Sequence, residues 1–123
     1  MISLVIIKLL LLQIKHFLVD YLLQTDEQIK TKGSYGNLTG LSHSFYHGLF
    51  TAVVFFPFTD SMFALSLGLL DFIIHYHIDY VKTKYGNKDI TTKAFWNHMG
   101  YDQMAHQFTY VLFIAMYMGY ITK

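Results

Sequence analysis

Residues 75–80 read HYHIDY, and this stretch lies inside an apolar run that extends from about Ser61 to Val81. His75 and Asp79 are four residues apart, so on a helix their side chains share one face and lie one turn apart. Ionisable side chains are costly in an apolar helix unless they are paired. Some group elsewhere in the fold must therefore hold His75 and Asp79 in place.

The composition favours a membrane protein. The chain has 123 residues, enough for a single domain over 1–123, and 54% are hydrophobic while only 14% are charged, with a mean hydropathy of +0.35. A soluble domain carries about 25% charged residues. Lipid is therefore expected to cover much of the surface, and the lipid bilayer is the expected partner.

Two classes of site are excluded by composition. The absence of cysteine excludes disulfides and thiolate metal sites. A net charge of +1 gives no electrostatic footprint for nucleic acid, so we expect no nucleic-acid partner.

The chain divides into four apolar segments, at about residues 2–23, 38–56, 61–81 and 95–121. Each is close to the 20 or so residues that a helix needs to cross about 30 Å of hydrocarbon. The link between the second and third is short, because Pro57 ends one helix and Asp60 or Ser61 can cap the next. These features predict an all-α protein, an integral membrane up-down bundle of four transmembrane helices. A soluble buried bundle is the alternative. A cleaved signal peptide is disfavoured, because the first segment has neither a basic start nor an Ala-x-Ala site after it.

Lysines indicate the orientation of this bundle. The middle connection, FPFTD, has no lysine, whereas the other two carry Lys30, Lys32, Lys82, Lys84, Lys88 and Lys93. The positive-inside rule places loops 24–37 and 82–94 in the cytoplasm and both termini outside it, in the inner membrane of a bacterium. Lys8 and Lys15 fall within the first segment and blur this asymmetry.

Every predicted helix carries one pair of ionisable residues at the same four-residue spacing. The pairs lie in HFLVD, HSFYH, HYHID and DQMAH, and they are His16 and Asp20, His43 and His47, His75 and Asp79, and Asp102 and His106. All of them fall in the cytoplasmic half of the bundle. They form two layers about 6 Å apart, because each residue rises 1.5 Å along a helix. The deeper layer holds His16, His47, His75 and His106.

Imidazole and carboxylate ligands without sulfur predict a divalent metal site of one or two ions. Zinc is the first choice on base rates, and manganese, iron and nickel suit the same ligands. A structural network of His–Asp hydrogen bonds and a proton or ion pathway stay open as alternatives.

Five further polar residues are expected to support the ligands or to contact a substrate. Asp71 precedes His75 by one turn and is expected to orient the His75 ring. The others are Gln24, Tyr46, Gln103 and Gln107.

The motifs H-x-x-x-D-Y-x-L-Q-T, H-x-x-x-H, H-x-x-x-D-Y and D-Q-x-x-H resemble the domain-of-unknown-function 3307 family of small polytopic membrane proteins from bacteria and phage. The resemblance covers about residues 9–110 and implies no reaction. A looser similarity is to membrane-bound metal-dependent hydrolases. The family positions carried over are His16, Asp20, Gln24, His43, His47, His75, Asp79, Asp102, Gln103 and His106.

These features favour a metal-dependent hydrolase of a membrane-associated substrate. One of Asp20, Asp79 or Asp102 would remain off the metal as the general base. Two alternatives stay open. One is a transporter or channel for metal ions or protons, and the other is a structural or phage membrane-permeabilising protein in which the metal only holds the helices together. Four short helices leave little room for a shielded pocket, which favours a homodimer.

Overall fold

The computed structural model describes all 123 residues and is all-α without strands, as predicted. Five α-helices are present, together with a π-helical turn at Leu18–Leu22 and a 3-10 turn at Phe56–Phe58. The helices are α1 (Ile2–Phe17), α2 (Asp26–Thr31), α3 (Leu38–Phe55), α4 (Ser61–Tyr85) and α5 (Lys93–Ile121).

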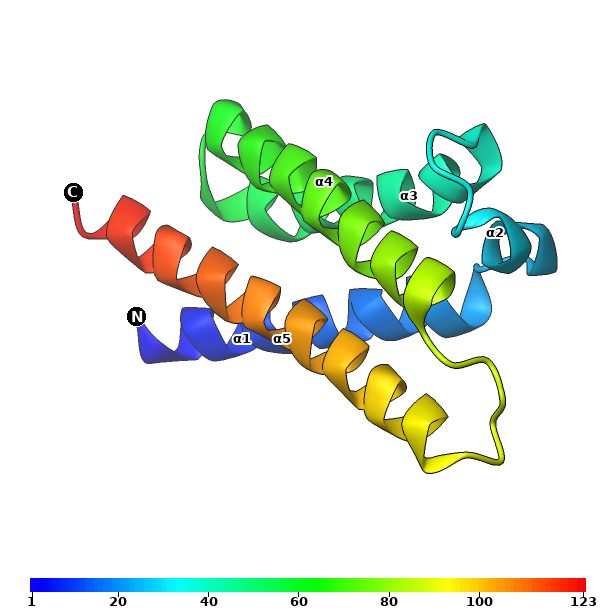
Figure 1. Ribbon diagram of the computed structural model, residues 1–123. Helices are drawn as coiled ribbons and strands as arrows, with labels where there is room; N and C mark the ends of the chain where they lie inside the picture. Colours follow the sequence, from blue (N-terminus) through cyan, green and yellow to red (C-terminus); the bar gives the residue numbers. More distant parts are fainter.

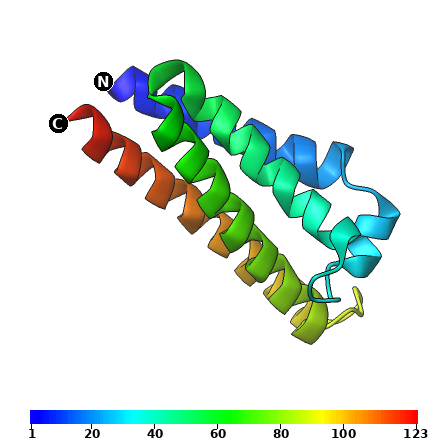
Figure 2. The same cartoon turned by 90° about the horizontal axis from the view of Figure 1, so that it is seen from above.

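The four long helices lie side by side and alternate in direction (Figure 1). Helix α1 packs against α3 and α5, and α4 packs against the same two helices. Figure 2 shows both termini at one end of the molecule and α2 at the other. The connections expected in the cytoplasm therefore share one end of the fold.

The helix ends refine the expected segments. Helix α4 continues past Val81 to Tyr85, and α5 already starts at Lys93. Asp60 caps α4 as predicted, since its carboxylate accepts a hydrogen bond of 2.8 Å from the Phe63 amide. This bond and a second one from the Tyr120 hydroxyl hold the pKa of Asp60 below its usual range.

The connection expected as a loop at 24–37 contains a helix, α2, which corrects that prediction. Thr25 and Gln28 form a capping box in which each side chain bonds the other residue's backbone amide, at 3.2 and 3.0 Å. The sequence signal is the T-x-x-Q spacing in TDEQ.

The first apolar segment is not one uniform α-helix. It changes to a π-helical turn after Phe17, where the Leu23 amide bonds the Leu18 carbonyl oxygen at 2.9 Å. Such turns are rare and occur frequently at functional sites. This one contains Asp20 and therefore positions that carboxylate.

Only two helical segments are long and apolar enough to cross a membrane, Ile2–Leu22 and Ser61–Tyr85. Core helices of soluble proteins and signal sequences meet the same criterion, so this result supports membrane association only weakly. Helices α3 and α5 do not meet it, because His43, His47, Asp102 and His106 reduce their mean hydropathy.

Helices α3 and α4 cross closely at a pair of glycines. A Cβ atom added to Gly68 would lie 2.7 Å from the Gly48 carbonyl oxygen and 2.9 Å from the Ala52 Cβ. Glycine at both positions lets the two backbones touch, as small residues do where membrane helices pack. This contact fixes the separation of the two helices that carry four of the predicted ligands.

Replacement of Gly68 by Val is expected to force α3 and α4 apart and to lower the stability by about 1–3 kcal/mol. Thermal unfolding of the detergent-solubilised protein, followed by circular dichroism, measures this loss. Gly119→Val is the matched control, because no atom lies within 4 Å of a Cβ at Gly119. Equal stability of the two variants would contradict the proposed role of the crossing.

Candidate metal centre

The eight predicted ligands converge on one region between the four long helices. Seven are buried, and the Asp20 side chain is 12% exposed. Helix α1 and its π turn supply His16 and Asp20, and the other three long helices supply one pair each. The structure thus brings together all four pairs that share the four-residue spacing.

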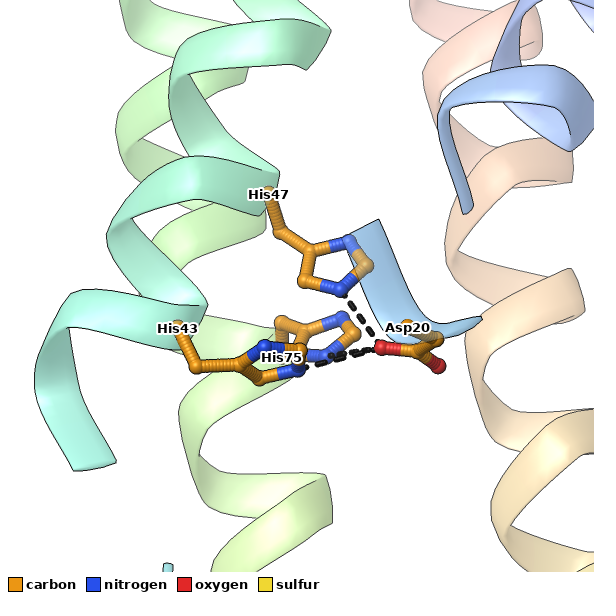
Figure 3. Close-up of side chains that lie close together, drawn as sticks. All are labelled: Asp20, His43, His47 and His75. Carbon is orange, nitrogen blue, oxygen red and sulfur yellow. Dashed lines mark hydrogen bonds and ion pairs between the residues drawn. The ribbon is translucent and has the colours of Figure 1, made fainter. Parts of the chain in front are cut away.

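Asp20 is surrounded by imidazole nitrogens. Its Oδ1 lies 2.8 Å from His47 Nε2 and 3.0 Å from His43 Nε2. His75 Nε2 approaches the same oxygen at 3.8 Å, so three rings from two helices point at one carboxylate (Figure 3). The other oxygen, Oδ2, lies 3.1 Å from His16 Nε2.

Asp79 faces two of the same rings from the other side. Its Oδ2 lies 3.4 Å from His75 Nε2 and 3.5 Å from His43 Nε2. Its Oδ1 lies 3.2 Å from His106 Nε2. The Nε2 atoms of His43 and His75 are therefore each close to both carboxylates, Asp20 and Asp79.

The two layers expected from the sequence have closed into one cluster. Side chains tilt toward the N-terminus of their helix. On α1 and α4 this tilt carries Asp20 and Asp79 deeper into the bundle. On α3 and α5, which run the opposite way, it carries His47 and His106 back toward the loops.

The distances suit a small divalent cation. Ligands on a tetrahedral zinc ion with bonds of about 2.0 Å lie about 3.3 Å apart. The separations of 3.0–3.8 Å between the Nε2 atoms of His43 and His75 and the oxygens of Asp20 and Asp79 bracket this value. Ligand atoms lie within 4.8 Å of one another in two groups, Asp20, His43, His47 and His75, and His75, Asp79 and His106.

Several of these atoms have no hydrogen-bond partner. Both ring nitrogens of His43 and of His75 are buried without a well-aligned hydrogen bond, as is Asp102 Oδ1, which only faces His106 Nε2 at 3.5 Å. Buried polar atoms in folded proteins are nearly always hydrogen-bonded. Close approach without hydrogen-bond alignment is the arrangement expected of ligands that share a cation, so the residues fit a divalent ion.

His16 and His47 each have partners on both ring nitrogens. Tyr110 Oη lies 2.7 Å from His16 Nδ1, and Gln103 Oε1 lies 3.0 Å from His16 Nε2. Lys15 Nζ lies 3.2 Å from His47 Nδ1 and favours the tautomer that donates from Nε2 to Asp20. These two rings are thus suited to orienting Asp20.

Asp71 does not orient the His75 ring, which corrects that prediction. Its Oδ2 accepts hydrogen bonds of 2.5 Å from both Lys15 Nζ and Thr51 Oγ1. Lys15 is next to His16 on α1, and its ammonium group bonds the Asp71 carboxylate in place of the His75 ring. The spacing of seven between Lys8 and Lys15 places both lysines on one helix face, and this is the sequence signal for a buried role of Lys15.

The remaining predicted residues divide into two groups. Gln103 Nε2 bonds Asp102 Oδ2 at 3.0 Å, and Gln24 Nε2 bonds the Asp20 carbonyl oxygen at 3.1 Å. Gln107 instead accepts a hydrogen bond from Gln13, and Tyr46 is 42% exposed. The structure therefore does not bring Gln107 or Tyr46 into contact with the cluster.

Two lysines expected in solvated loops pair with the cluster. Lys32 Nζ lies 2.7 Å from Asp79 Oδ2, and Lys82 Nζ lies 3.0 Å from Asp102 Oδ2. The Lys32 side chain is only 9% exposed, because α2 folds it against the end of the bundle. The pairing of Lys32 was not predicted, because α2 itself was not expected.

A family model described as "Protein of unknown function (DUF3307)" matches residues 5–123, almost the whole chain. No curated protein and no solved structure gives a significant match.

Replacement of Lys15 by Met leaves Asp71 buried without a counter-charge and is expected to cost about 3–5 kcal/mol. The double variant Lys15→Met/Asp71→Leu removes both charges and is expected to regain most of that loss. Thermal unfolding in detergent compares the two. A double variant no more stable than Lys15→Met would show that the pair does not act as a unit.

Proposed function

Because the chain belongs to the DUF3307 family, whose description assigns no function, we propose its function from the site itself. The protein is an integral membrane protein with a His/Asp metal centre near the cytoplasmic face of a bacterial inner membrane. The centre hydrolyses a membrane-associated ester or phosphoester.

One observation carries the proposal: the buried Nε2 atoms of His43 and His75, which make no well-aligned hydrogen bond, face Asp79 Oδ2, whose only other partner is Lys32. A purely structural network would be expected to satisfy its own members, because each unpaired buried polar group costs about 1–3 kcal/mol. A bound cation would satisfy them all at once.

The surface supports a bilayer as the surroundings. Large apolar side chains are exposed on all four long helices, including α3 and α5, which do not meet the simple criterion for membrane spans. Among them are Ile6, Leu10, Val53, Leu65, Leu69, Phe108 and Val111. A surrounding bilayer accommodates exposed apolar side chains on every long helix, because lipid tails are themselves apolar. The interior in turn holds more polar and charged side chains than apolar ones.

We assign one ion, zinc by base rates, to His43, His75, Asp20 and Asp79. His75 belongs to both groups of converging ligand atoms. Because one imidazole nitrogen binds only one ion, the two groups cannot each hold an ion through the same His75 nitrogen, which favours a single ion. His16, His47 and His106 then hold the two carboxylates by hydrogen bonds. Manganese, iron or nickel would suit the same ligands.

Asp102 is the carboxylate best placed as the general base. It lines a surface groove of about 550 Å³, and its buried Oδ1 faces only the His106 ring, at 3.5 Å. A divalent ion supplies Lewis-acid chemistry, since it polarises the scissile ester and acidifies water. Water oxygen forms the new bond to phosphorus or carbon, its proton passes to Asp102 Oδ1, and the leaving alcohol takes that proton as its bond breaks.

The structure favours hydrolysis over transport. A transporter needs a polar route through the half of the bundle that holds the termini. That half is filled by apolar side chains that are at most 1% exposed, Leu12, Phe55, Leu67 and Phe113. Lys8 is buried there too, but its ammonium bonds the Val54 carbonyl oxygen and lies over the Phe58 ring.

The purified protein is expected to hold one divalent ion per chain, measured by mass spectrometry of its metal content. His43→Ala and Asp79→Ala are expected to lose the ion, because each removes a ligand. Tyr46→Phe is the matched control on α3, since Tyr46 is exposed and does not contact the cluster. Thermal unfolding of each variant without metal shows whether it still folds.

Two results would overturn the proposal. Parent protein without metal, even after incubation with zinc, would exclude a metal-dependent hydrolase. Metal-loaded protein that passes zinc across liposomes, and releases no product from phospholipid or acyl-ester substrates, would identify a transporter instead.

A further inference from the structure

Two hollows meet beside the candidate metal centre. The first, of about 600 Å³, lies between α2, the end of α4 and the start of α5. Four lysines and no carboxylate line it, Lys30, Lys32, Lys82 and Lys88. A concave surface lined by charges of one sign concentrates ligands of the opposite sign.

The second hollow is the groove of about 550 Å³ between α4 and α5, and it is largely apolar. Ile78, Val81, Tyr101 and Ala105 line it, and Asp102 of the cluster lies in its wall. The lining residues come from the last turns of α4 and the N-terminal part of α5, so the groove lies near the loop that joins these helices (Figure 1). Lys82 and His98 line both hollows, so the two adjoin.

We propose that the two hollows together bind a single amphiphile, with a phosphate-bearing headgroup in the lysine pocket and its hydrocarbon chain in the groove. This inference rests on the proposed function and names the substrate class of its site, a lipid-like phosphoester.

The charges link the headgroup position to the centre. Lys30 and Lys88 are exposed and form no ion pair, so both are free to bind an anion. Lys32 and Lys82 each face the pocket while paired to a cluster carboxylate, Asp79 and Asp102 respectively. A phosphate held by these lysines therefore lies next to the ligands and the general base.

The groove is the expected binding site for the hydrocarbon chain of the amphiphile. Its apolar side chains, Ile78, Val81, Tyr101 and Ala105, come from two neighbouring helices and offer a hydrocarbon chain an apolar contact surface. A free phosphate would use the lysine pocket alone, and a neutral lipid would use the groove alone. An anionic amphiphile uses both.

The test measures binding to the full chain in phosphatidylcholine nanodiscs by isothermal titration calorimetry, with protein-free nanodiscs as the blank. The probes are inorganic phosphate, the non-hydrolysable dodecylphosphonate and uncharged dodecyl maltoside. Dodecylphosphonate is expected to bind at least about tenfold more tightly than the other two, since it alone fills both hollows. This preference is expected with and without zinc.

The variant Lys30→Gln/Lys88→Gln is expected to weaken dodecylphosphonate binding about fivefold at low salt. Lys93→Gln/Lys123→Gln is the matched control, because it removes the same charge from exposed lysines that line neither hollow. An equal loss in both variants would overturn the assigned pocket. Equal affinity for inorganic phosphate and dodecylphosphonate would overturn the role of the groove.

The metal content of the same samples separates this inference from the proposed function. Stoichiometric zinc without phosphonate binding overturns the amphiphile alone. Phosphonate binding by a protein that takes up no zinc overturns the hydrolase alone.

Discussion

An ionisable side chain buried away from water needs a partner, and the arrangement of this bundle depends on that requirement. Each unpaired buried charge costs several kcal/mol, so no long helix can pack with its pair alone. Asp20 is satisfied by rings from other turns and helices, and Asp79 by rings from α3, α4 and α5 together with Lys32. The cluster therefore makes the four helices depend on one another, while their apolar outer faces leave them free to meet lipid.

The charges of the cluster are not evenly compensated. Lys32 pairs with Asp79, Lys82 pairs with Asp102, and deeper in the bundle Lys15 pairs with Asp71. Asp20 alone has no lysine, and it is the carboxylate that most imidazoles surround. Its charge must be balanced by a protonated ring or by a cation. The rings that approach it are held close together, and like charges on them would repel, so a single divalent cation is the simpler solution.

Residues four apart on a helix are neighbours, so the four pairs could be predicted from their spacing. The all-α fold followed from the length of the apolar segments, and the Asp60 cap from the preference of aspartate for that position. Contacts that depend on where one helix meets another could not be predicted. Asp71 was assigned to His75 on its own helix, but Lys15 reaches it from α1. Lys32 was assigned to a solvated loop, but the small helix α2 folds it onto Asp79. In both cases a long, flexible lysine found a buried carboxylate that only the tertiary fold brings within reach.

The use of lysine throughout, in a chain without arginine, matters for the carboxylates. A guanidinium group tends to bind both oxygens of a carboxylate at once, whereas an ammonium group acts as a point charge on one. Lys82 lies 3.0 Å from Asp102 Oδ2, and Oδ1 of that carboxylate faces the His106 ring at 3.5 Å. Lys32 pairs with Asp79 through Oδ2, while Oδ1 faces His106. Each lysine thus contacts one oxygen of its carboxylate and leaves the other to an imidazole. An oxygen that meets only an imidazole can still bind a cation or accept a proton, whereas an arginine at either position could bind both oxygens and displace the ring.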